Sequence, residues 1–157
     1  MIRSILLIIV SIICISLTGQ ISDNTNRKDQ SNVYNQSFIR YLKYLKNENI
    51  NIPDTIYIED DYKLTDSLMT RIGNTRLLVI KLSEVEKLVN KRKSITLYRL
   101  FPLEYKNHEF YISFVPFGVT HNPNEDGLFY SNSGSFWVIF DFYNGVFRFK
   151  KIDNNGI

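Results

Sequence analysis

The dipeptide Asn144-Gly145 lies between two segments of alternating apolar and polar residues, and it constrains the fold more than any other feature of the sequence. Asn and Gly both tolerate the positive φ that the turn of a two-residue β-hairpin requires. The pattern therefore predicts a hairpin of two strands, Ser135–Tyr143 and Val146–Lys151. In the register that this turn sets, Asp141 lies opposite Arg148, which is a favourable cross-strand charge pair. The same register pairs Phe140 with Phe149 and Phe142 with Phe147.

The alternation divides the side chains of this hairpin between two faces. We expect one face to belong to the core, because all of its residues are apolar: Phe136, Val138, Phe140, Phe142, Phe147 and Phe149. The other face is mixed and is expected to be only partly covered: Trp137, Ile139, Asp141, Tyr143, Val146, Arg148 and Lys150. Amphipathic aromatic residues on such a face are typical of protein interfaces and sugar-binding platforms. Trp137 and Tyr143 are therefore candidate binding residues.

Two more strands and one long loop are predicted beside this hairpin. Ser94–Phe101 and Glu109–Phe117 alternate in the same way, and Lys106-Asn107-His108 supplies turn-forming residues between them. The segment Thr120–Gly134 has no periodic pattern and is expected to be a loop. It carries three further candidate binding residues: His121, Phe129 and Tyr130. We expect this loop and the mixed face of the hairpin to meet a partner.

The first helix is predicted from apolar residues that recur at helical spacing between Tyr34 and Leu45. Ser31 or Asn32 can cap its start, and the polar stretch Asn47-Glu48-Asn49 is expected to end it. The helix is amphipathic, so we expect its aromatic side to pack against the sheet.

Two short strands are predicted in the middle of the chain. Thr55–Glu59 places Ile56 and Ile58 on one face. Thr75–Leu82 contains the continuous apolar run Leu77–Ile80, which predicts that both faces of this strand are covered.

Two short helices are predicted beside these strands. Thr65–Ile72 is a possible helix that Gly73 ends in a left-handed cap. Ser83 and Glu86 fit a capping box, which predicts a helix of two turns from there to about Asn90.

Residues 1–20 have the composition of a secretory signal peptide. Arg3 is followed by the apolar run Ile5–Leu17 and then by Thr18-Gly19-Gln20, which is small and polar. As a helix, this run of 13 residues spans about 20 Å, whereas a bilayer core is about 30 Å thick. We therefore expect cleavage and export to the periplasm or the extracellular space. The alternative is an uncleaved membrane anchor formed by residues 5–21.

The rest of the chain is predicted to contain one domain. Residues 21–30 are polar and without periodicity, which is typical of a flexible lead-in. Residues 31–157 are numerous enough to bury one core without disulfides. A net charge of +3 gives no argument for a nucleic-acid partner.

Few residues of the types that catalytic and metal sites need are present. The chain has a single cysteine, and its two histidines, His108 and His121, fall in predicted turns or loops. Asn122–Gly127 imitates the opening of a calcium loop, but Ser133 stands where such a loop needs a bidentate Glu. Glu59-Asp60-Asp61 is a carboxylate cluster that we expect to be solvated. No catalytic residue, metal site or cofactor is predicted.

Together these elements predict an α+β domain, with an N-terminal helix on a curved, mainly antiparallel sheet that ends in a β-meander. In element order, and only in that, this arrangement resembles a cystatin-like or NTF2-like roll. The expected function is that of an exported, non-enzymatic binding domain with a protein or a glycan as partner. One alternative is a small hydrolase-like or isomerase-like enzyme with a pocket inside the roll, in which His121 or an Asp is the base. The other is a structural envelope protein held in the membrane by residues 5–21.

Overall fold

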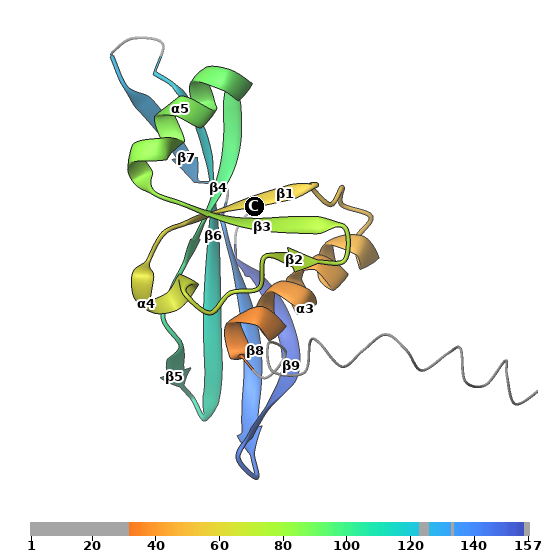
Figure 1. Ribbon diagram of the computed structural model, residues 1–157. Helices are drawn as coiled ribbons and strands as arrows, with labels where there is room; N and C mark the ends of the chain where they lie inside the picture. Colours follow the sequence, from red (N-terminus) through yellow and green to blue (C-terminus); the bar gives the residue numbers. More distant parts are fainter. Residues whose placement is uncertain (1–31, 123–125, 133, 156–157) are drawn as a thin grey trace, which may run out of the picture.

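A computed structural model of the chain describes residues 32–122, 126–132 and 134–155. The predicted signal peptide (1–20) and lead-in (21–30) lie outside the described residues. Within these ranges the chain forms three helices and nine strands (Figure 1). The helices are α3 (Val33–Asn47), α4 (Tyr62–Thr65) and α5 (Leu82–Arg92). The strands are β1 (Thr55–Glu59), β2 (Arg71–Ile72), β3 (Thr75–Ile80), β4 (Ser94–Leu100), β5 (Glu104–Lys106), β6 (Glu109–His121), β7 (Leu128–Asn132), β8 (Ser135–Tyr143) and β9 (Val146–Asn155).

All nine strands join one open sheet that is not strongly curled, with the order β2-β3-β1-β4-β6-β8-β9. The short strands β5 and β7 also pair with β6. The predicted α+β class is therefore confirmed, and the sheet is mainly antiparallel. It also contains parallel pairs that were not expected, because β1 pairs in parallel with both β3 and β4. The connection from β3 to β4 runs through α5 and passes over β1, which is the kind of crossover that strands running parallel in one sheet require.

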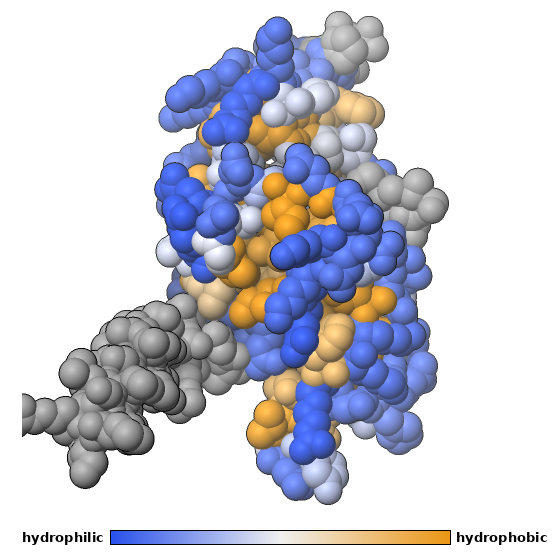
Figure 2. Space-filling model, turned by 90° about the vertical axis from the view of Figure 1, so that its right-hand side faces the viewer, coloured by the Kyte–Doolittle hydropathy of each residue, from blue (hydrophilic) through white to orange (hydrophobic). Residues whose placement is uncertain are grey.

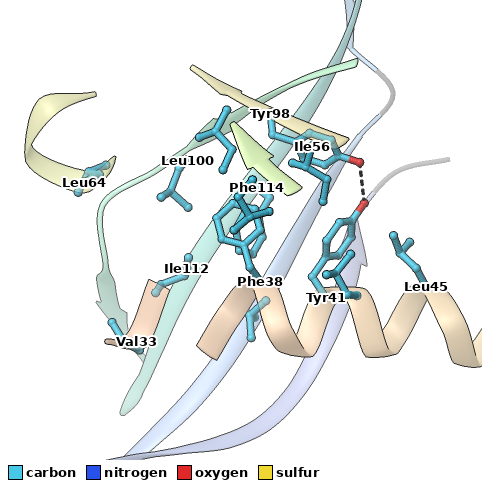
Figure 3. Close-up of a cluster of buried hydrophobic side chains, with 14 of the residues drawn as sticks. Val33, Phe38, Tyr41, Leu45, Ile56, Leu64, Tyr98, Leu100, Ile112 and Phe114 are labelled. Atoms are coloured by element: carbon cyan, nitrogen blue, oxygen red, sulfur yellow. Dashed lines mark hydrogen bonds between the residues drawn. The ribbon is translucent and has the colours of Figure 1, made fainter. Parts of the chain in front are cut away.

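Each face of the sheet carries its own core. Ile56 and Ile58 of β1 belong to the core under α3, whereas Tyr57 between them belongs to the core under α5. Figure 3 shows the first core, in which Phe38 of α3 lies 4.6 Å from Phe114 of β6 between ring centroids. The second core is smaller, with the buried residues Tyr57, Ile80, Val85, Val89, Ile95, Leu97 and Val119. The two helices thus lie on opposite faces, and each covers part of the sheet (Figure 1).

Helix α3 confirms the prediction from apolar spacing. It starts at Val33, and the side chain of Asn32 accepts a hydrogen bond of 2.8 Å from the backbone N–H of Tyr34. The buried side chain of Asn35 links α3 to the segment after α4. It accepts a hydrogen bond from the backbone N–H of Met69 and donates one to the carbonyl of Ser67.

The predicted helix Thr65–Ile72 is wrong. The helix there, α4, ends at Thr65, a turn follows it, and the backbone of Ser67 and Met69 is bound by the side chain of Asn35 on α3. The chain then forms the hairpin of β2 and β3, in which Ile72 pairs with Thr75. Gly73 does have a positive φ of 57°, but it serves this hairpin turn and caps no helix. A tertiary contact has overridden the local helical signal.

The predicted capping box of α5 is wrong in its residues. The N-cap is Lys81, two residues before Ser83, and the carboxylate of Glu84 accepts a 3.0 Å bond from its backbone N–H. Ser83 therefore lies inside the first turn. The expectation that both faces of Leu77–Ile80 are covered also fails, since α5 buries Ile80 but leaves Leu78 exposed.

The C-terminal hairpin confirms the predicted register. Asn144 and Gly145 have φ values of 50° and 79°, and Asp141 lies opposite Arg148. The ion-pair distance from Asp141 is to Lys150 instead, at 3.9 Å, while the Arg148 guanidinium lies over the ring of Tyr143. The predicted phenylalanine pairs also form, Phe140 with Phe149 and Phe142 with Phe147.

One residue of extra length distorts β9. Phe140 pairs with Phe149 but Ile139 pairs with Lys151, so Lys150 forms a bulge. Beyond the bulge, Ile152 packs against the core under α3, and Asp153 lies opposite Trp137. On each side of the bulge, successive side chains of β9 still point to opposite faces of the sheet.

The predicted division of this hairpin into faces needs two corrections. Phe142, expected in the core, is 52% exposed, because β8 and β9 continue past the end of β6 and of α3. Ile139, expected on the partly covered face, is only 1% exposed. It is flanked on both sides by neighbouring strands, with Tyr111 of β6 and Lys151 of β9 as its register partners.

The predicted loop Thr120–Gly134 is largely a second hairpin. Strand β6 continues to His121, and β7 pairs with it from Leu128 to Asn132. The backbone N–H of Asn122 donates to the carbonyl of Gly127 across the turn. Residues 123–125 and Ser133 lie outside the described residues.

We expect Gly145→Val to destabilise the domain by about 1–2 kcal/mol, because a β-branched residue is strained at positive φ. No atom lies within 4 Å of the added Cβ, so the strain of the backbone alone is measured. Asp141→Lys should cost less, about 0.2–1 kcal/mol. Urea unfolding measures both values, and Gly145→Asn is the control that should stay close to the parent. The reverse ranking would place the turn elsewhere.

A second prediction concerns the hydroxyls of Tyr41 and Tyr98, which meet in the α3 core at 3.2 Å (dashed line in Figure 3). Burial raises the pKa of both phenols, so both stay protonated and satisfy each other. Tyr98→Phe should cost about 1–3 kcal/mol, because it leaves the Tyr41 hydroxyl buried without this partner. Adding Tyr41→Phe should recover much of the loss in a double-mutant cycle. Additive losses would contradict the pairing.

Candidate functional site

The five residues predicted to bind a partner do not form one site. Trp137 is half-buried in the middle of β8, and Tyr143 is exposed at the turn end of the same strand. The other three, His121, Phe129 and Tyr130, lie on β6 and β7 at the opposite end of the sheet, near α5 (Figure 1).

His121 has a structural role at that end. Its Nε2 and the Oδ1 of Asn90 are 2.5 Å apart, so the ring links the end of β6 to α5. Phe129 and Tyr130 point to opposite faces, because they pair with the neighbouring residues Thr120 and Val119. The ring of Tyr130 meets Phe117 edge-on, at 6.5 Å between centroids.

None of the three described helices lies over the face of β6, β8 and β9 that is opposite α3, and we name it the Trp137 face. Helix α5 covers β1, β3, β4 and the far end of β6, and it stops short of β8 (Figure 1). The Trp137 face is made of these side chains: Glu109, Tyr111, Ser113, Trp137, Asp141, Lys150, Lys151 and Asp153.

Trp137 is framed on both sides by residues of the neighbouring strands. Ser113 of β6 and Asp153 of β9 are its register partners. The ring of Tyr111 meets the indole edge-to-face, at 6.0 Å between centroids and 86° between planes. Lys151 forms an ion pair of 2.8 Å with Asp153 beside the indole. The aromatic centre of the face is therefore bordered by charges that are already paired.

A network of three polar side chains, Glu109, Tyr111 and Lys150, lies next to this aromatic centre. The hydroxyl of Tyr111 donates a 2.7 Å bond to Oε2 of Glu109, and the ammonium of Lys150 binds Oε1 of the same carboxylate. The bonds from Lys150 and Tyr111 lower the pKa of Glu109 below its usual value. The same bonds to Glu109 raise the pKa of Lys150 and of Tyr111. All three side chains are thus fixed in single protonation states near neutral pH.

Sequence reasoning placed Trp137 and Lys150 on this face but missed Glu109 and Tyr111. Glu109 and Tyr111 are two residues apart on a strand with alternating side chains. That spacing alone could have indicated that they share a face. Their meeting with Trp137 depends on the pairing of β6 with β8, and nothing local in the sequence specifies that pairing.

A separate cleft of about 550 Å³ opens at the carboxyl ends of β1 and β4. The connections from these two strands leave in opposite directions, one towards β3 and one towards β6, which is where α/β sheets often bind ligands. Its walls include Glu59, Asp60, Asp61, Lys63 and Arg99.

The carboxylates of this cleft are engaged in the fold. Arg99 binds Glu59 with two hydrogen bonds, of 2.8 and 3.2 Å. Asp60 accepts from the hydroxyl of Thr65, and Asp61 caps α4. The expectation of a solvated cluster is therefore wrong for Glu59, whose side chain is only 17% exposed, while Asp61 is exposed.

Among the described residues, no group of three or more His, Cys, Asp or Glu is placed to hold a metal ion. Within the same ranges, no helix combines the length and the apolar character needed to cross a membrane. No known protein family matches the chain, and neither does any curated protein or solved structure.

We expect Lys150→Gln to raise the pKa of Glu109, because it removes the largest stabiliser of that carboxylate. Tyr111→Phe should raise this pKa less. Side-chain NMR titration of Glu109 measures both changes, with Lys46→Gln as a control on the exposed side of α3. Since the folded-state pKa is lowered, this stabilisation exists above the unfolded-state pKa and is lost as the pH falls through the folded value. An unchanged pKa in Lys150→Gln would contradict the network.

Proposed function

We propose that the protein is a non-enzymatic binding module that receives its partner on the Trp137 face. The observation that carries this proposal is the pair of Trp137 and Tyr111 on a sheet face that none of the described helices covers. The hydrogen bonds and ion pairs around the two rings support it further. They hold the polar side chains in place before a partner arrives, which lowers the entropic cost of binding.

The partner that this face suits best is a neutral glycan. The carboxylates of Glu109 and Asp153 are paired with Lys150 and Lys151, so no strong net field attracts a charged partner. The centre of a protein interface is depleted of charged residues, whereas here charges border the indole directly. Aromatic rings beside fixed hydrogen-bonding groups suit a flat, hydroxyl-rich ligand. A protein partner is the competing outcome of the test below.

Export remains part of the proposal. The signal-like composition of residues 1–20 supports a periplasmic or extracellular protein, where glycans are available. The alternative is anchoring in the membrane through residues 5–21, as a structural envelope protein.

A pocket enzyme is the second candidate, and the cleft beside Arg99 favours it. For this candidate we compare the chain with a cystatin-like or NTF2-like roll in the order of its elements. The helix packed across antiparallel strands supports that comparison. The base would then be an Asp of the cleft, because His121 is linked to Asn90 at the other end of β6. The engaged carboxylates of the cleft support binding more than proton transfer.

Trp137 is the single tryptophan of the chain, so its fluorescence reports directly on the proposed site. We expect soluble N-acetylglucosamine oligomers or neutral hexose polymers to shift its emission in a saturable titration. Tyr111→Ala and Asp153→Ala should each weaken binding by about tenfold, which corresponds to about 1.4 kcal/mol.

The matched control is Phe129→Ala, which removes an exposed aromatic ring outside the Trp137 face. It should leave the affinity unchanged. An emission that no glycan shifts would contradict the glycan proposal. Equal losses in Phe129→Ala and Tyr111→Ala would contradict the location.

A further inference from the structure

A small cleft opens where β1 and β4 separate. The two strands pair at Tyr57 with Leu97 and at Ile58 with Tyr98, and they diverge towards their amino ends (Figure 1). The cleft between them has a volume of about 340 Å³, which lies within the range of small-molecule sites. We name it the Arg92 cleft, and its lining includes Thr55 and Tyr57 of β1, Arg92 at the end of α5, and Ser94, Ile95 and Thr96 of β4.

Arg92 is oriented over this cleft by an aromatic ring. Its guanidinium lies 5.6 Å from the centre of the Tyr57 ring. Among the described residues that line the cleft, Arg92 is the one that carries a charge. Its neighbours Lys91 and Lys93 offset the negative end of the α5 dipole. The fork of Arg92 is therefore held towards the cleft, in a geometry that suits a phosphate or a carboxylate.

Two further arginines lie beside the cleft on the same face of the sheet. Thr55 is the register partner of Arg76 on β3, and Arg76 lies opposite Arg71 on β2. Register partners point to the same face, which here is the face of Tyr57 and α5. Like charges directly opposite each other on paired strands are destabilising. An anion bound between the two guanidinium groups would replace this repulsion by attraction.

These arginines are not balanced by acidic side chains. In the part of the chain that the structure describes, no carboxylate lies within ion-pair distance of Arg71, Arg76 or Arg92. The sequence gives the reason, because residues 67–83 and 87–103 contain no Asp and no Glu. Figure 2 faces the amino end of β1 and shows hydrophilic side chains projecting from its upper part, where α5 lies. A net positive charge therefore remains around the cleft.

The carboxylates nearest in sequence lie away from the cleft. Glu48 is the C-cap residue of α3, and Asp54 lines a groove beside two lysines of that helix, on the other face of the sheet. Glu84 accepts a backbone hydrogen bond at the start of α5, the end away from Arg92. Glu86 lies about 120° around α5 from Arg92, since successive residues of a helix turn by about 100°.

We propose that the Arg92 cleft binds a small anion that carries at least two phosphate groups. One phosphate lies in the cleft beside Arg92 and Thr55, and the second bridges Arg76 and Arg71. A single phosphate is too small for both places, because Thr55 and Arg71 are two strand spacings apart, about 10 Å. A phosphate also offers three acceptor oxygens and up to two charges, whereas a carboxylate offers two oxygens and one charge. This site is independent of the Trp137 face, which lies over β6, β8 and β9.

The first test is calorimetric titration of the full chain with sodium tripolyphosphate at constant ionic strength. We expect saturable binding to one site, and about tenfold weaker binding in Arg92→Gln and in Arg76→Gln. The matched control is Arg148→Gln, since the guanidinium of Arg148 also lies over a tyrosine ring, 4.6 Å from the centre of Tyr143. It should leave the affinity unchanged. An absence of binding, or an equal loss in Arg148→Gln, would overturn the proposal.

Two other anions test the chemistry of the ligand in the same titration. Orthophosphate should bind at least about tenfold more weakly than tripolyphosphate, because it occupies one of the two places. Citrate, which carries three carboxylates, should also bind more weakly. An equal affinity for orthophosphate would refute the requirement for two phosphates, and an equal affinity for citrate would refute the selection of phosphate.

Thermal unfolding separates binding from damage to the fold. Without an anion, Arg71→Gln should raise the melting temperature, because it removes the repulsion with Arg76. Tripolyphosphate should raise the melting temperature of the parent chain and raise that of Arg71→Gln by less. A variant that only damaged the structure would melt lower in both conditions. A lower melting temperature of Arg71→Gln without the anion, or an equal gain with it, would contradict the proposal.

Discussion

Strand β6 is hydrogen-bonded along both of its edges, and this double pairing holds the molecule together. Its thirteen residues pair with β4 and β5 on one edge and with β7 and β8 on the other. Alternate side chains of β6 therefore enter different cores, Phe114 under α3 and Val119 under α5. Among the described strands, the hydrogen-bonded path from the parallel strands β1 and β3 to the C-terminal hairpin of β8 and β9 passes through β6. Without β6 the Trp137 face would have no Tyr111 beside its indole.

Local signals predicted the elements whose geometry is decided locally. The Asn144-Gly145 turn, helix α3 and the strand Thr55–Glu59 follow from turn chemistry and from spacing, and all three were predicted. The helix predicted at Thr65–Ile72 fails because the side chain of Asn35, 32 residues before Ser67 and 34 before Met69, binds the backbone of that segment. The parallel pairing of β1 could not be predicted from the sequence either, because the residues of the strands that α5 connects do not indicate in which direction those strands run.

The residues of the candidate site likewise fall into those that a local pattern predicted and those that it missed. Trp137 was found because its own strand alternates, and its partners Glu109 and Tyr111 were missed because they come from a strand more than twenty residues away. His121, Phe129 and Tyr130 were grouped with it because a patternless segment was interpreted as a loop. That segment is a hairpin on β6, which carries the three residues to the α5 end of the sheet. Proximity in sequence was a poor guide to proximity in space.

The bulge at Lys150 reverses which residues of β9, even-numbered or odd-numbered, lie on a given face of the sheet. Before it, even-numbered residues lie on the Trp137 face; after it, odd-numbered residues do. The apolar Ile152 and the charged Asp153 each reach a suitable environment only because one residue stands outside the alternation. If Lys150 were drawn into the regular ladder opposite Ile139, every side chain after it would change faces, as every codon changes after a frameshift in a gene. Deletion of Lys150 would instead remove the bulge and leave the later side chains on their present faces. The strand can therefore lose one residue at the bulge itself, whereas a change of one residue elsewhere along the paired part of β9 would reverse the faces of every side chain that follows.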